Sequence, residues 1–309
     1  MTNNLKVSIA LTTYNHEEFI SQSLESILNQ KVHFDYEIVI GEDNSKDRTL
    51  EIIKNYQAKY PDKVRVLVRL GNLGYTRNFD DTMQQCQGEY IAIFDGDDIM
   101  NAGKLQKQVD FLDNHYDYVM VGHVVQAFDS MTGKVVRIIQ PKKKKDYYTI
   151  EDLIVEGSFF ANSSKMFRRS AYPKDGIDKR IKYIADWAVT LDIVEDKKIG
   201  ILWDNLAFYR VHGTSIMQKL RGADDFSDKA VIIDSINKKY SNKYRNLFNR
   251  QWAYAYLIYG IDELDNGKNI SARRLFLKSI KKDFKYSLSV YFNLILSFFP
   301  KIIINHIKK

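Results

Sequence analysis

Hydrophobic positions along the first hundred residues alternate between two spacings. Four short apolar runs predict β-strands, at residues 5–11, 36–40, 64–68 and 90–94. Three segments between them have apolar side chains every three or four residues and predict helices, at residues 16–29, 47–60 and 75–85. Strands and helices that alternate at these lengths indicate βαβ units and a parallel sheet. Runs such as VSIAL and IAIF are apolar without a break, which is typical of parallel strands covered on both faces.

The pattern changes after a further helix predicted at residues 102–115. Extended segments then become more frequent than helices. Strands are predicted at residues 119–128, 134–139, 163–169 and 201–209, and helices at residues 149–155 and 184–195. From residue 226 onward the chain has helical spacing, with Tyr and Leu on the apolar faces. The sequence therefore predicts an α/β part followed by an α-helical C-terminal region.

The stretch IAIFDGDDIM ends the fourth predicted strand with three carboxylates, those of Asp95, Asp97 and Asp98. In an open parallel sheet, ligands bind beyond the carboxyl ends of the strands. Like charges this close repel one another unless a cation neutralises them, and carboxylate oxygens are the ligands that Mg²⁺ or Mn²⁺ prefers. The stretch therefore predicts a metal ion that bridges protein carboxylate to a phosphorylated ligand. A solvated acidic turn that caps the next helix is the alternative.

Charge is divided unevenly along the chain. Residues 268–309 contain ten Lys or Arg and one acidic residue, whereas residues 1–267 contain 36 basic and 38 acidic residues. A nucleic-acid enzyme carries its basic residues around its active groove, so this division argues against nucleic acid as a partner. The single cysteine, Cys86, excludes an intramolecular disulfide framework. The start, MTNNLKVSIALTTYN, has no long apolar segment with a small-residue cleavage site, so no secretory signal is predicted.

Polar residues and glycines also follow the other predicted strands. The segment LTTYNHEEF ends the first strand, VIGEDNSKDRT the second and VRLGNLGYTRNF the third, before DGDD ends the fourth. In this order and spacing, the four segments resemble the family 2 glycosyltransferases, which have the GT-A fold. The resemblance covers roughly the first two-thirds of the chain and is to members of the bacterial surface-polysaccharide type.

The resemblance implies a nucleotide site at the ends of the first three strands. Asp43, with Glu42 beside it, matches the acidic pair that contacts the nucleotide base and ribose. Many members have two aspartates and a glycine where this chain has EDN, which leaves open which carboxylate holds the base. Thr12 and Tyr14 would line the base pocket. Arg77 matches the basic residue near the nucleotide and diphosphate, with a helix-surface arginine as the alternative.

The same resemblance assigns the three carboxylates after the fourth strand and one in the second half of the chain. Asp95 matches the ribose contact and Asp97 the metal ligand, while Asp98 would lie toward the donor sugar or the acceptor. In YIADWAVTLDI, Asp186 matches the aspartate of the family's Glu-Asp-Trp/Tyr motif, which is the general base. Ala185 replaces the common glutamate, so this match is partial, and a helix N-cap is the alternative for Asp186.

The segment FYRVHGTSIM, residues 208–217, resembles the family's Y-R-x-H-x-x-S segment. His212 would then complete the metal or diphosphate site, with Arg210 nearby. A satisfied structural histidine is the alternative, and the residues on both sides of His212 favour the functional role.

The resemblance implies a GT-A catalytic domain over residues 1–220 with a mostly parallel central sheet and flanking helices. Residues 1–100 would bind the nucleotide sugar and residues 101–220 would bind the acceptor. A helical region would follow at residues 221–309.

The implied activity is metal-dependent, inverting transfer of a hexosyl or N-acetylhexosaminyl group. The donor would be a nucleotide sugar, expected to be UDP-linked. The acceptor would be a hydroxyl of a glycan or lipid-diphosphate-linked molecule in polysaccharide biosynthesis, such as capsule or lipopolysaccharide. The cofactor would be Mn²⁺ or Mg²⁺, and one metal and one base suffice for this chemistry.

The C-terminal tail, residues 268–309, joins basic clusters to an uncharged segment. Residues 286–300, YSLSVYFNLILSFFP, are fewer than the roughly 20 that a membrane span needs. Basic residues beside Phe, Tyr and Leu are typical of an interfacial helix. The tail therefore predicts a cytoplasmic protein bound peripherally to the anionic inner face of the plasma membrane, which Lys142–Lys145 would also face. A tail packed on the catalytic domain is the alternative.

Two other functions compete with the glycosyltransferase prediction. A haloacid-dehalogenase-like phosphatase also has Asp-x-Asp after a strand, but after the first strand of its core, whereas three strand–helix units precede it here. A catalytically silent carbohydrate- or membrane-binding module on the same scaffold is the second alternative. The presence of Asp97, Asp186 and His212 argues against a silent module.

Overall fold

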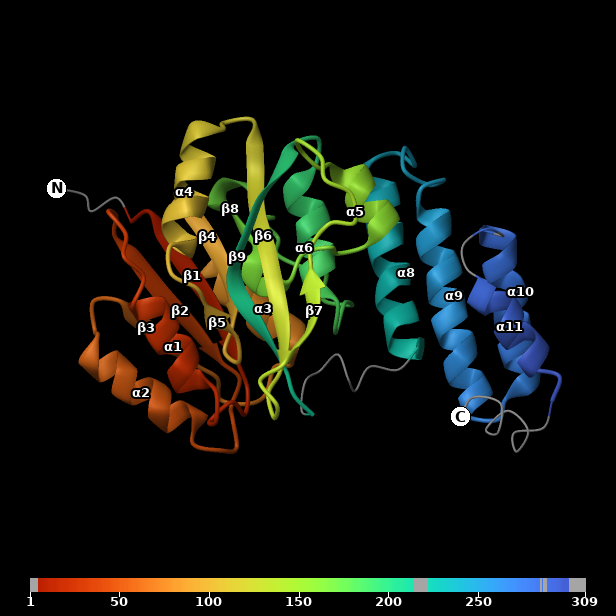
Figure 1. Ribbon diagram of the computed structural model, residues 1–309, viewed down its shortest axis with the longest axis horizontal. Helices are drawn as coiled ribbons and strands as arrows, with labels where there is room; N and C mark the ends of the chain where they lie inside the picture. The colour runs from red at the N-terminus through yellow and green to blue at the C-terminus, as the bar shows by residue number, and fades with distance from the viewer. Residues whose placement is uncertain (1–4, 214–221, 284, 286–287, 300–309) are drawn as a thin grey trace. The chain divides into compact units, whose positions relative to one another are not determined.

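The computed structural model describes residues 5–213, 222–283, 285 and 288–299, and the chain forms two compact units (Figure 1). One unit comprises residues 1–153 and 158–213, and the other comprises residues 154–157 and 214–309. The first unit is α/β and the second is helical, which confirms the predicted fold class. The predicted functional limits of the domains stay a prediction.

A twisted sheet forms the centre of the first unit (Figure 1). Within the described residues it has nine strands in the order β3-β2-β1-β4-β8-β6-β9-β5, with β7 paired to β6. The strands are β1 (Val7–Thr13), β2 (Tyr36–Glu42), β3 (Val64–Val68), β4 (Tyr90–Asp95), β5 (Ile99–Met100), β6 (Tyr118–Asp129), β7 (Val135–Ile139), β8 (Met166–Arg168) and β9 (Lys198–Val211). The first four strands are parallel, so their carboxyl ends lie at one edge of the sheet.

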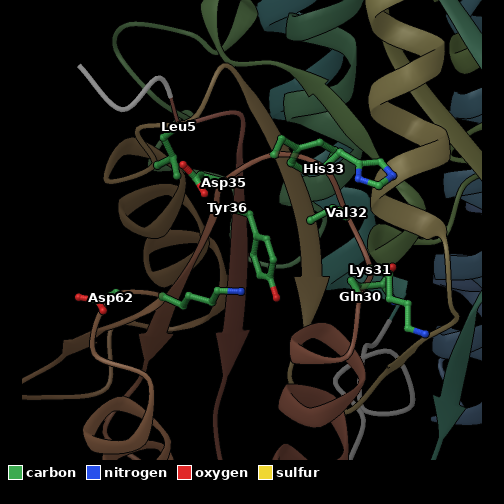
Figure 2. Close-up of a pocket in the computed structure, with 10 residues that line it drawn as sticks. Leu5, Gln30, Lys31, Val32, His33, Asp35, Tyr36 and Asp62 are labelled. Atoms are coloured by element: carbon green, nitrogen blue, oxygen red, sulfur yellow. The ribbon is translucent and has the colours of Figure 1, made fainter. Parts of the chain in front are cut away.

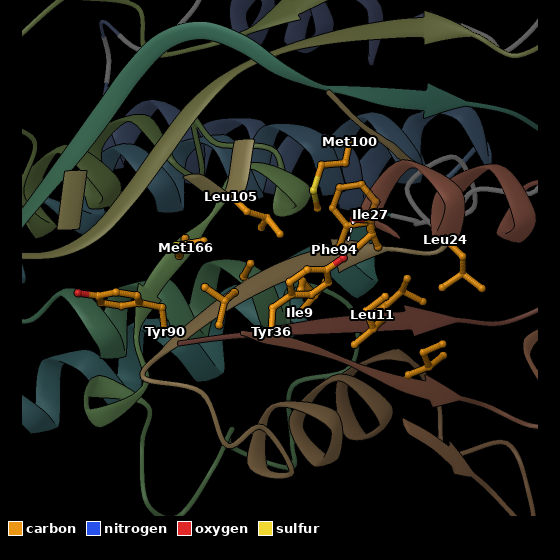
Figure 3. Packing of buried hydrophobic residues seen from close by; sticks show 14 of the residues in the cluster. Ile9, Leu11, Leu24, Ile27, Tyr36, Tyr90, Phe94, Met100, Leu105 and Met166 are labelled. Carbon is orange, nitrogen blue, oxygen red and sulfur yellow. Dashed lines mark hydrogen bonds between the residues drawn. The ribbon is translucent and has the colours of Figure 1, made fainter. Parts of the chain in front are cut away.

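Helices cover both faces of the sheet. The helical segments of the α/β part are α1 (Ile20–Leu28), α2 (Thr49–Lys59), α3 (Tyr75–Gln84), α4 (Lys104–Asn114), the short 3₁₀ turns η1 (Asn162–Ser164) and η2 (Arg169–Ala171), and α6 (Ala185–Val194). Helix α5 (Ile150–Glu156) begins in the first unit and ends in the second. Helices α1 and α4 lie on one face, and α3 and α6 lie on the other (Figure 1). Figure 3 shows the core on the first face, where Leu24 and Ile27 of α1 pack with Leu11 and Phe94 of the strands. Because this core is continuous, it holds the strand ends in fixed register.

Two features of the sheet differ from the predicted elements. Residues 163–169, expected to be extended, form the end of η1, the three-residue strand β8 and the start of η2. The 3₁₀ turn is closed by the Ser164 hydroxyl, which donates to the Ala161 carbonyl at 2.8 Å. Strand β5 was not predicted, because two residues are too few to show any periodicity.

The second unit consists of helices. These are α8 (Gly222–Lys239), α9 (Phe248–Asp265), α10 (Asn269–Lys282) and α11 (Leu288–Leu296). Its core joins Leu264 of α9 to Phe276 of α10 and Val290 of α11. Among the described residues, none of the helices has the length and apolar character needed to cross a membrane. Residues 284, 286–287 and 300–309 of the predicted tail lie outside the described residues.

Candidate active site

The carboxyl ends of β1, β2 and β4 bring polar side chains to one edge of the sheet. Thr12 of β1 pairs in register with Asp95 at the end of β4, and Thr13 pairs with Glu42 at the end of β2. This arrangement follows from parallel pairing, which aligns the carboxyl ends of neighbouring strands. The sheet therefore juxtaposes the predicted residues of three separate sequence segments.

Asp95 lies at the centre of this edge. The Thr12 hydroxyl donates to its Oδ1 at 3.2 Å, and the Asn162 amide donates to both carboxylate oxygens at 3.3 and 3.4 Å. Burial raises the pKa of Asp95 to about 7, and the negative charge of Asp97 adds to the shift. Asp95 is thus a carboxylate held in place by neutral donors, as a residue that contacts ligand hydroxyls needs to be.

Asp97 forms a cluster with two imidazoles. His212, just after β9, places Nε2 2.8 Å from Oδ2 of Asp97, and His16, after β1, places Nε2 3.9 Å from the same oxygen. One ligand atom from each of the three residues lies within 4.8 Å of the others. Burial alone would raise the pKa of Asp97, but the histidine charges lower it below the usual value. Carboxylate and imidazole ligands at this spacing fit a divalent transition ion such as Mn²⁺.

His16 is oriented by groups around it. Its Nδ1 lies 3.2 Å from the Thr13 hydroxyl, which leaves Nε2 to face Asp97. A hydrogen-bond partner on the second ring nitrogen is the usual support of a metal-binding histidine. A Cβ at Gly96 would lie 2.7 Å from the Thr13 hydroxyl oxygen and 3.2 Å from His16 Nδ1, so glycine is required for this approach. The sequence analysis did not identify His16.

Asp98 points away from the cluster into the protein. Its side chain is fully buried, accepts a hydrogen bond from the Ser163 hydroxyl and accepts another from the Arg210 backbone N–H at 2.9 Å. Burial raises the pKa of Asp98 well above its usual range. Through these two hydrogen bonds Asp98 connects the loop after β4 to η1 and β9. Its predicted contact with the donor sugar or acceptor stays a prediction.

Arg210 lies beside the metal-type cluster. Its Nε donates to the Asp97 carbonyl at 2.7 Å, and one terminal nitrogen donates to the Gln22 side chain at 2.6 Å. Its guanidinium also lies over the Phe19 and Phe128 rings, 4.8 Å from each centroid. These contacts fix a positive charge next to the carboxylates.

The acidic pair after β2 organises the loops around it. Glu42 is buried and accepts hydrogen bonds from the backbone N–H groups of Asn44 and Ser45. Asp43 accepts hydrogen bonds from the N–H groups of Leu73 and Gly74, at 2.6 and 3.0 Å. Burial raises the pKa of Asp43, although these N–H groups oppose the shift. Which of the two carboxylates contacts a base therefore stays open.

The remaining predicted nucleotide residues differ in exposure. Tyr14 is 40% exposed at the start of the loop after β1, and its place in a base pocket stays a prediction. Arg77 is exposed on α3, and its role near the diphosphate stays a prediction. Arg69, which the sequence analysis did not identify, lies near Asp43 and has one terminal nitrogen, Nη2, buried without a hydrogen-bond partner among the described residues.

Asp186 is the second residue of α6, in its first turn. Its side chain is 25% exposed, and its Oδ2 lies 3.4 Å from Nζ of the buried Lys165. Its charge also acts on Asp95 and on the phenol of Tyr75, whose pKa burial raises well above the usual range. Asp186 is thus inside the helix rather than at its N-cap, and it lies near the carboxylates at the end of β4.

Three side chains of the segment 162–165, which forms η1 and leads into β8, contact these acidic residues. Asn162 donates to Asp95, Ser163 to Asp98, and Lys165 is paired with Asp186. The sequence pattern predicted only an extended segment here, although the polar run NSSK between the apolar residues FFA and MF was a signal.

A separate hollow of about 650 Å³ lies at the other ends of the strands. Figure 2 shows its lining, which includes Gln30, His33 and Tyr36. These residues lie at or before the amino-terminal ends of β1, β2 and β3, and none belongs to the carboxylate cluster. Ligands of open α/β sheets bind at the carboxyl ends, so the cluster and not this hollow is the candidate site.

Comparison with known proteins identifies the family. The model for "Glycosyl transferase family 2" matches residues 8–176. The putative glycosyltransferase EpsE of Bacillus subtilis is 32% identical over 172 residues, which cover 56% of this chain and 59% of EpsE. The uncharacterized protein Rv1520 of Mycobacterium tuberculosis is 31% identical over 211 residues, which cover 68% of this chain and 60% of that protein. The chain thus spans about 60% of the length of these curated relatives.

The fold is shared with a solved structure. The crystal structure of S. aureus TarS 1–349 in complex with UDP-GlcNAc superposes with a TM-score of 0.61 and 20% sequence identity. The match covers 95% of this chain and 90% of that chain, which agrees with the predicted GT-A arrangement. Because the family model spans more than half of the chain and includes every predicted strand end from β1 to β4, the family prediction is confirmed. The chain belongs to glycosyl transferase family 2.

Proposed function

We propose that this protein transfers a sugar from a nucleotide sugar, UDP-linked, to a hydroxyl of a glycan or lipid-linked acceptor, with inversion at the anomeric carbon. The observation that carries the proposal is the cluster at the carboxyl end of β4. There Asp97 is paired with His212, and the charge of Asp186 on α6 acts on Asp95. The TarS neighbour was solved with UDP-GlcNAc, which supports a UDP-sugar donor of the hexosyl or N-acetylhexosaminyl class.

The proposed cofactor is Mn²⁺ or Mg²⁺ held by His16, Asp97 and His212. Two imidazoles and one carboxylate fit Mn²⁺ better than Mg²⁺, because Mg²⁺ prefers oxygen ligands throughout. When bound, such an ion neutralises charge on a leaving diphosphate. Arg210 supplies a further fixed positive charge beside Asp97.

Asp186 is the proposed general base. Its carboxylate accepts the proton of the acceptor hydroxyl while the acceptor oxygen forms a bond to the anomeric carbon. The bond between that carbon and the phosphate oxygen breaks, and the nucleoside diphosphate leaves with the electron pair. Thr12 and Asn162 hold Asp95 in place to bind donor hydroxyls. One carboxylate thus performs the proton transfer, unlike the two carboxylates of a glycosidase.

The test is nucleotide release from a panel of UDP-, GDP- and dTDP-sugars, with Mn²⁺ or Mg²⁺ and with EDTA. We expect release from one donor, stopped by EDTA and by Asp97→Ala. The matched control is Asp204→Ala, which removes a 50% exposed aspartate paired with Lys107. If the wild-type protein releases nothing and calorimetry detects no UDP binding with Mn²⁺, the protein is the silent module and the proposal fails.

We further propose that the second unit binds an anionic membrane surface, which would place the protein on the cytoplasmic face of the plasma membrane near a lipid-diphosphate-linked acceptor. Helix α11 exposes Leu288, Phe292 and Ile295, which are 87%, 51% and 60% exposed. Helix α10 carries Arg274 and further exposed lysines toward its C-terminal end. Exposed apolar side chains with basic neighbours suit the boundary between headgroups and acyl chains.

Sedimentation with vesicles of phosphatidylglycerol and phosphatidylcholine tests the membrane proposal. The double variant Phe292→Ser, Ile295→Ser should lose most of the bound fraction. A matched control, Val135→Ser, Ile138→Ser, removes two apolar side chains of β7 that are 52% and 56% exposed. Equal binding of both variants and the wild type would contradict the assignment of α11 as the membrane-binding face.

A further inference from the structure

We propose that Lys165 positions the carboxylate of Asp186 for proton transfer by holding one of its oxygens in place. The inference rests on the proposed function and concerns a residue to which neither the family resemblance nor the sequence pattern assigned a role. Lys165 lies between η1 and β8, and Asp186 lies on α6. Two elements that are separate in sequence thus meet at this pair.

The backbone of Lys165 is fixed to the central sheet. Its carbonyl accepts a hydrogen bond from the Ile93 N–H of β4 at 3.0 Å, and its own N–H donates to the Asn162 carbonyl at 3.2 Å. Strand β4 also ends in Asp95. The backbone of Lys165 is therefore joined to the strand that carries Asp95.

The side chain of Lys165 has no exposed surface, and both of its hydrogen-bond acceptors among the described residues belong to Asp186. Nζ lies 3.4 Å from the Asp186 Oδ2 and 3.3 Å from the Asp186 backbone carbonyl oxygen. A buried ammonium needs such partners, because water cannot solvate it. Contact with both the side chain and the backbone of one residue restricts the rotation of the carboxylate about its own Cα–Cβ bond.

The pairing leaves the second carboxylate oxygen of Asp186 available. No hydrogen bond from a described residue reaches Oδ1, and the side chain remains 25% exposed. One oxygen is thus held by a buried cation, while the other accepts no hydrogen bond from a described residue. This arrangement suits a general base, because a small misplacement of the base can cost about a hundredfold in rate.

The surroundings make a positive partner necessary. Asp186 faces the negative charge of Asp95 on β4 and the phenol of Tyr75 on α3, and Tyr75 accepts a hydrogen bond from Asn162 at 3.1 Å. When Asp95 is ionised, its charge repels the Asp186 carboxylate. The ammonium group of Lys165 opposes this repulsion.

The test compares Lys165→Met with Asp186→Asn and the double variant. Methionine keeps the length and volume of lysine without the charge, and Asp186 is exposed enough to be solvated by water after the change, so the fold should survive. The probe is UDP release from the sugar nucleotide that the wild type uses best, with water as the acceptor. Calorimetry of UDP with Mn²⁺ measures the donor site independently. Lys229→Met is the matched control, since Lys229 is a nearly buried lysine paired with Asp225 in the other unit.

We expect Lys165→Met to lower kcat about 10- to 100-fold, with KM for the donor and the UDP dissociation constant changed less than threefold. In the Asp186→Asn background, Lys165→Met should change kcat less than twofold, because this background lacks the carboxylate that Lys165 would position. Lys229→Met should leave kcat within twofold of the wild type.

Three results would overturn the inference. One is a folded Lys165→Met protein with wild-type kcat, and another is an equal loss of kcat in both backgrounds. The third is weaker UDP binding that accounts for the whole loss. In each of these cases the proposed function is still supported, provided that the wild-type enzyme transfers the sugar. A wild type that neither transfers nor binds UDP overturns both.

Discussion

Asp97, His16 and His212 come from three distant parts of the chain, and His212 lies 115 residues from Asp97. His16→Ala removes one imidazole from this cluster and should weaken Mn²⁺ binding about 10- to 100-fold. Electron paramagnetic resonance of free Mn²⁺, titrated in the presence of UDP, measures the affinity. His33→Ala, which removes an exposed histidine before β2, is the control. Equal affinities in the two variants would show that Asp97 and His212 suffice.

Sequence motifs indicated the acidic residues of the candidate site but not the residues that contact them. Asp95, Asp97 and His212 lie in segments whose order and residue types are specific. His16 lies in the loop after β1, and only the three-dimensional approach of β4 and β9 shows that its ring faces Asp97. The sequence did not identify Lys165 either, because a buried lysine cannot be distinguished from a solvated one by its place in the chain.

Lys104 is a second buried lysine, without the partner that Lys165 has. Its side chain begins α4 with no exposed surface, and its Nζ has no hydrogen-bond partner among the described residues. Burial lowers the pKa of Lys104 from 10.5 to about 7. Between these two values the unfolded chain binds a proton that the folded chain does not, so the free energy of unfolding rises with pH in this window. Below about pH 7 the full cost of burying the lysine is present.

Lys104→Met should therefore increase the free energy of unfolding by about 1–3 kcal/mol at pH 7. The gain should shrink as the pH approaches 10.5. Urea unfolding at pH 6.5, 8 and 9.5 measures both effects. Lys107→Met, a substitution of a half-exposed lysine on the same helix, should change stability by less than about 0.5 kcal/mol. A gain independent of pH would show that Lys104 is charged in the folded state.

At the scale of elements, the close packing of α3 on β2 positions Tyr75 near Asp95. Gly41 of β2 makes this packing possible, since a Cβ there would lie 2.0 Å from the Thr82 Oγ1 and 2.7 Å from the Asn78 Oδ1. The Asn78 amide also donates to the Gly41 carbonyl at 2.8 Å. Helix α3 therefore packs directly against the backbone of β2 at Gly41, where there is no room for a side chain.

Gly41→Ala should lower the free energy of unfolding by about 1–3 kcal/mol through overpacking. Chemical denaturation measures the loss. Gly71→Ala is the matched control, because a Cβ at Gly71 meets no atom within 4 Å. If the two variants are equally stable, α3 moves away from β2 at no cost and does not position Tyr75 rigidly.

Periodicity predicted the long elements and failed on the short ones. The strands and helices from β1 to β4, together with α4, lie within a few residues of their predicted positions, because each buries a regular apolar face. Strands β5 and β8 have two and three residues, which is less than the pattern needs. Strand β8 is antiparallel between β4 and β6, and such an insertion depends on tertiary pairing that no local pattern encodes.

At the scale of the whole molecule, charge separates along the chain. Residues 1–267 have two more acidic than basic residues, whereas residues 268–309 have nine more basic than acidic residues. If the separation serves membrane binding, the position of a basic residue should affect vesicle binding more than the total net charge does.

Two variants with the same net charge test this. One replaces exposed basic residues of α10 by Gln, at Arg274, Lys278, Lys281 and Lys282. The other replaces exposed lysines of the first unit by Gln, at Lys31, Lys54, Lys59 and Lys63.

The α10 variant should bind anionic vesicles at least 100-fold more weakly than the wild type, because each basic residue near the surface contributes about 1 kcal/mol. The first-unit variant should bind within threefold of the wild type, although its net charge is equally reduced. Vesicle partition coefficients at low and physiological salt measure the difference, which salt should diminish. Equal weakening of both variants would mean that the protein responds to anionic lipid only through its total charge. The basic residues of α10 would then contribute no more to membrane binding than basic residues elsewhere in the protein, and they would not help to hold the protein near a membrane-bound acceptor.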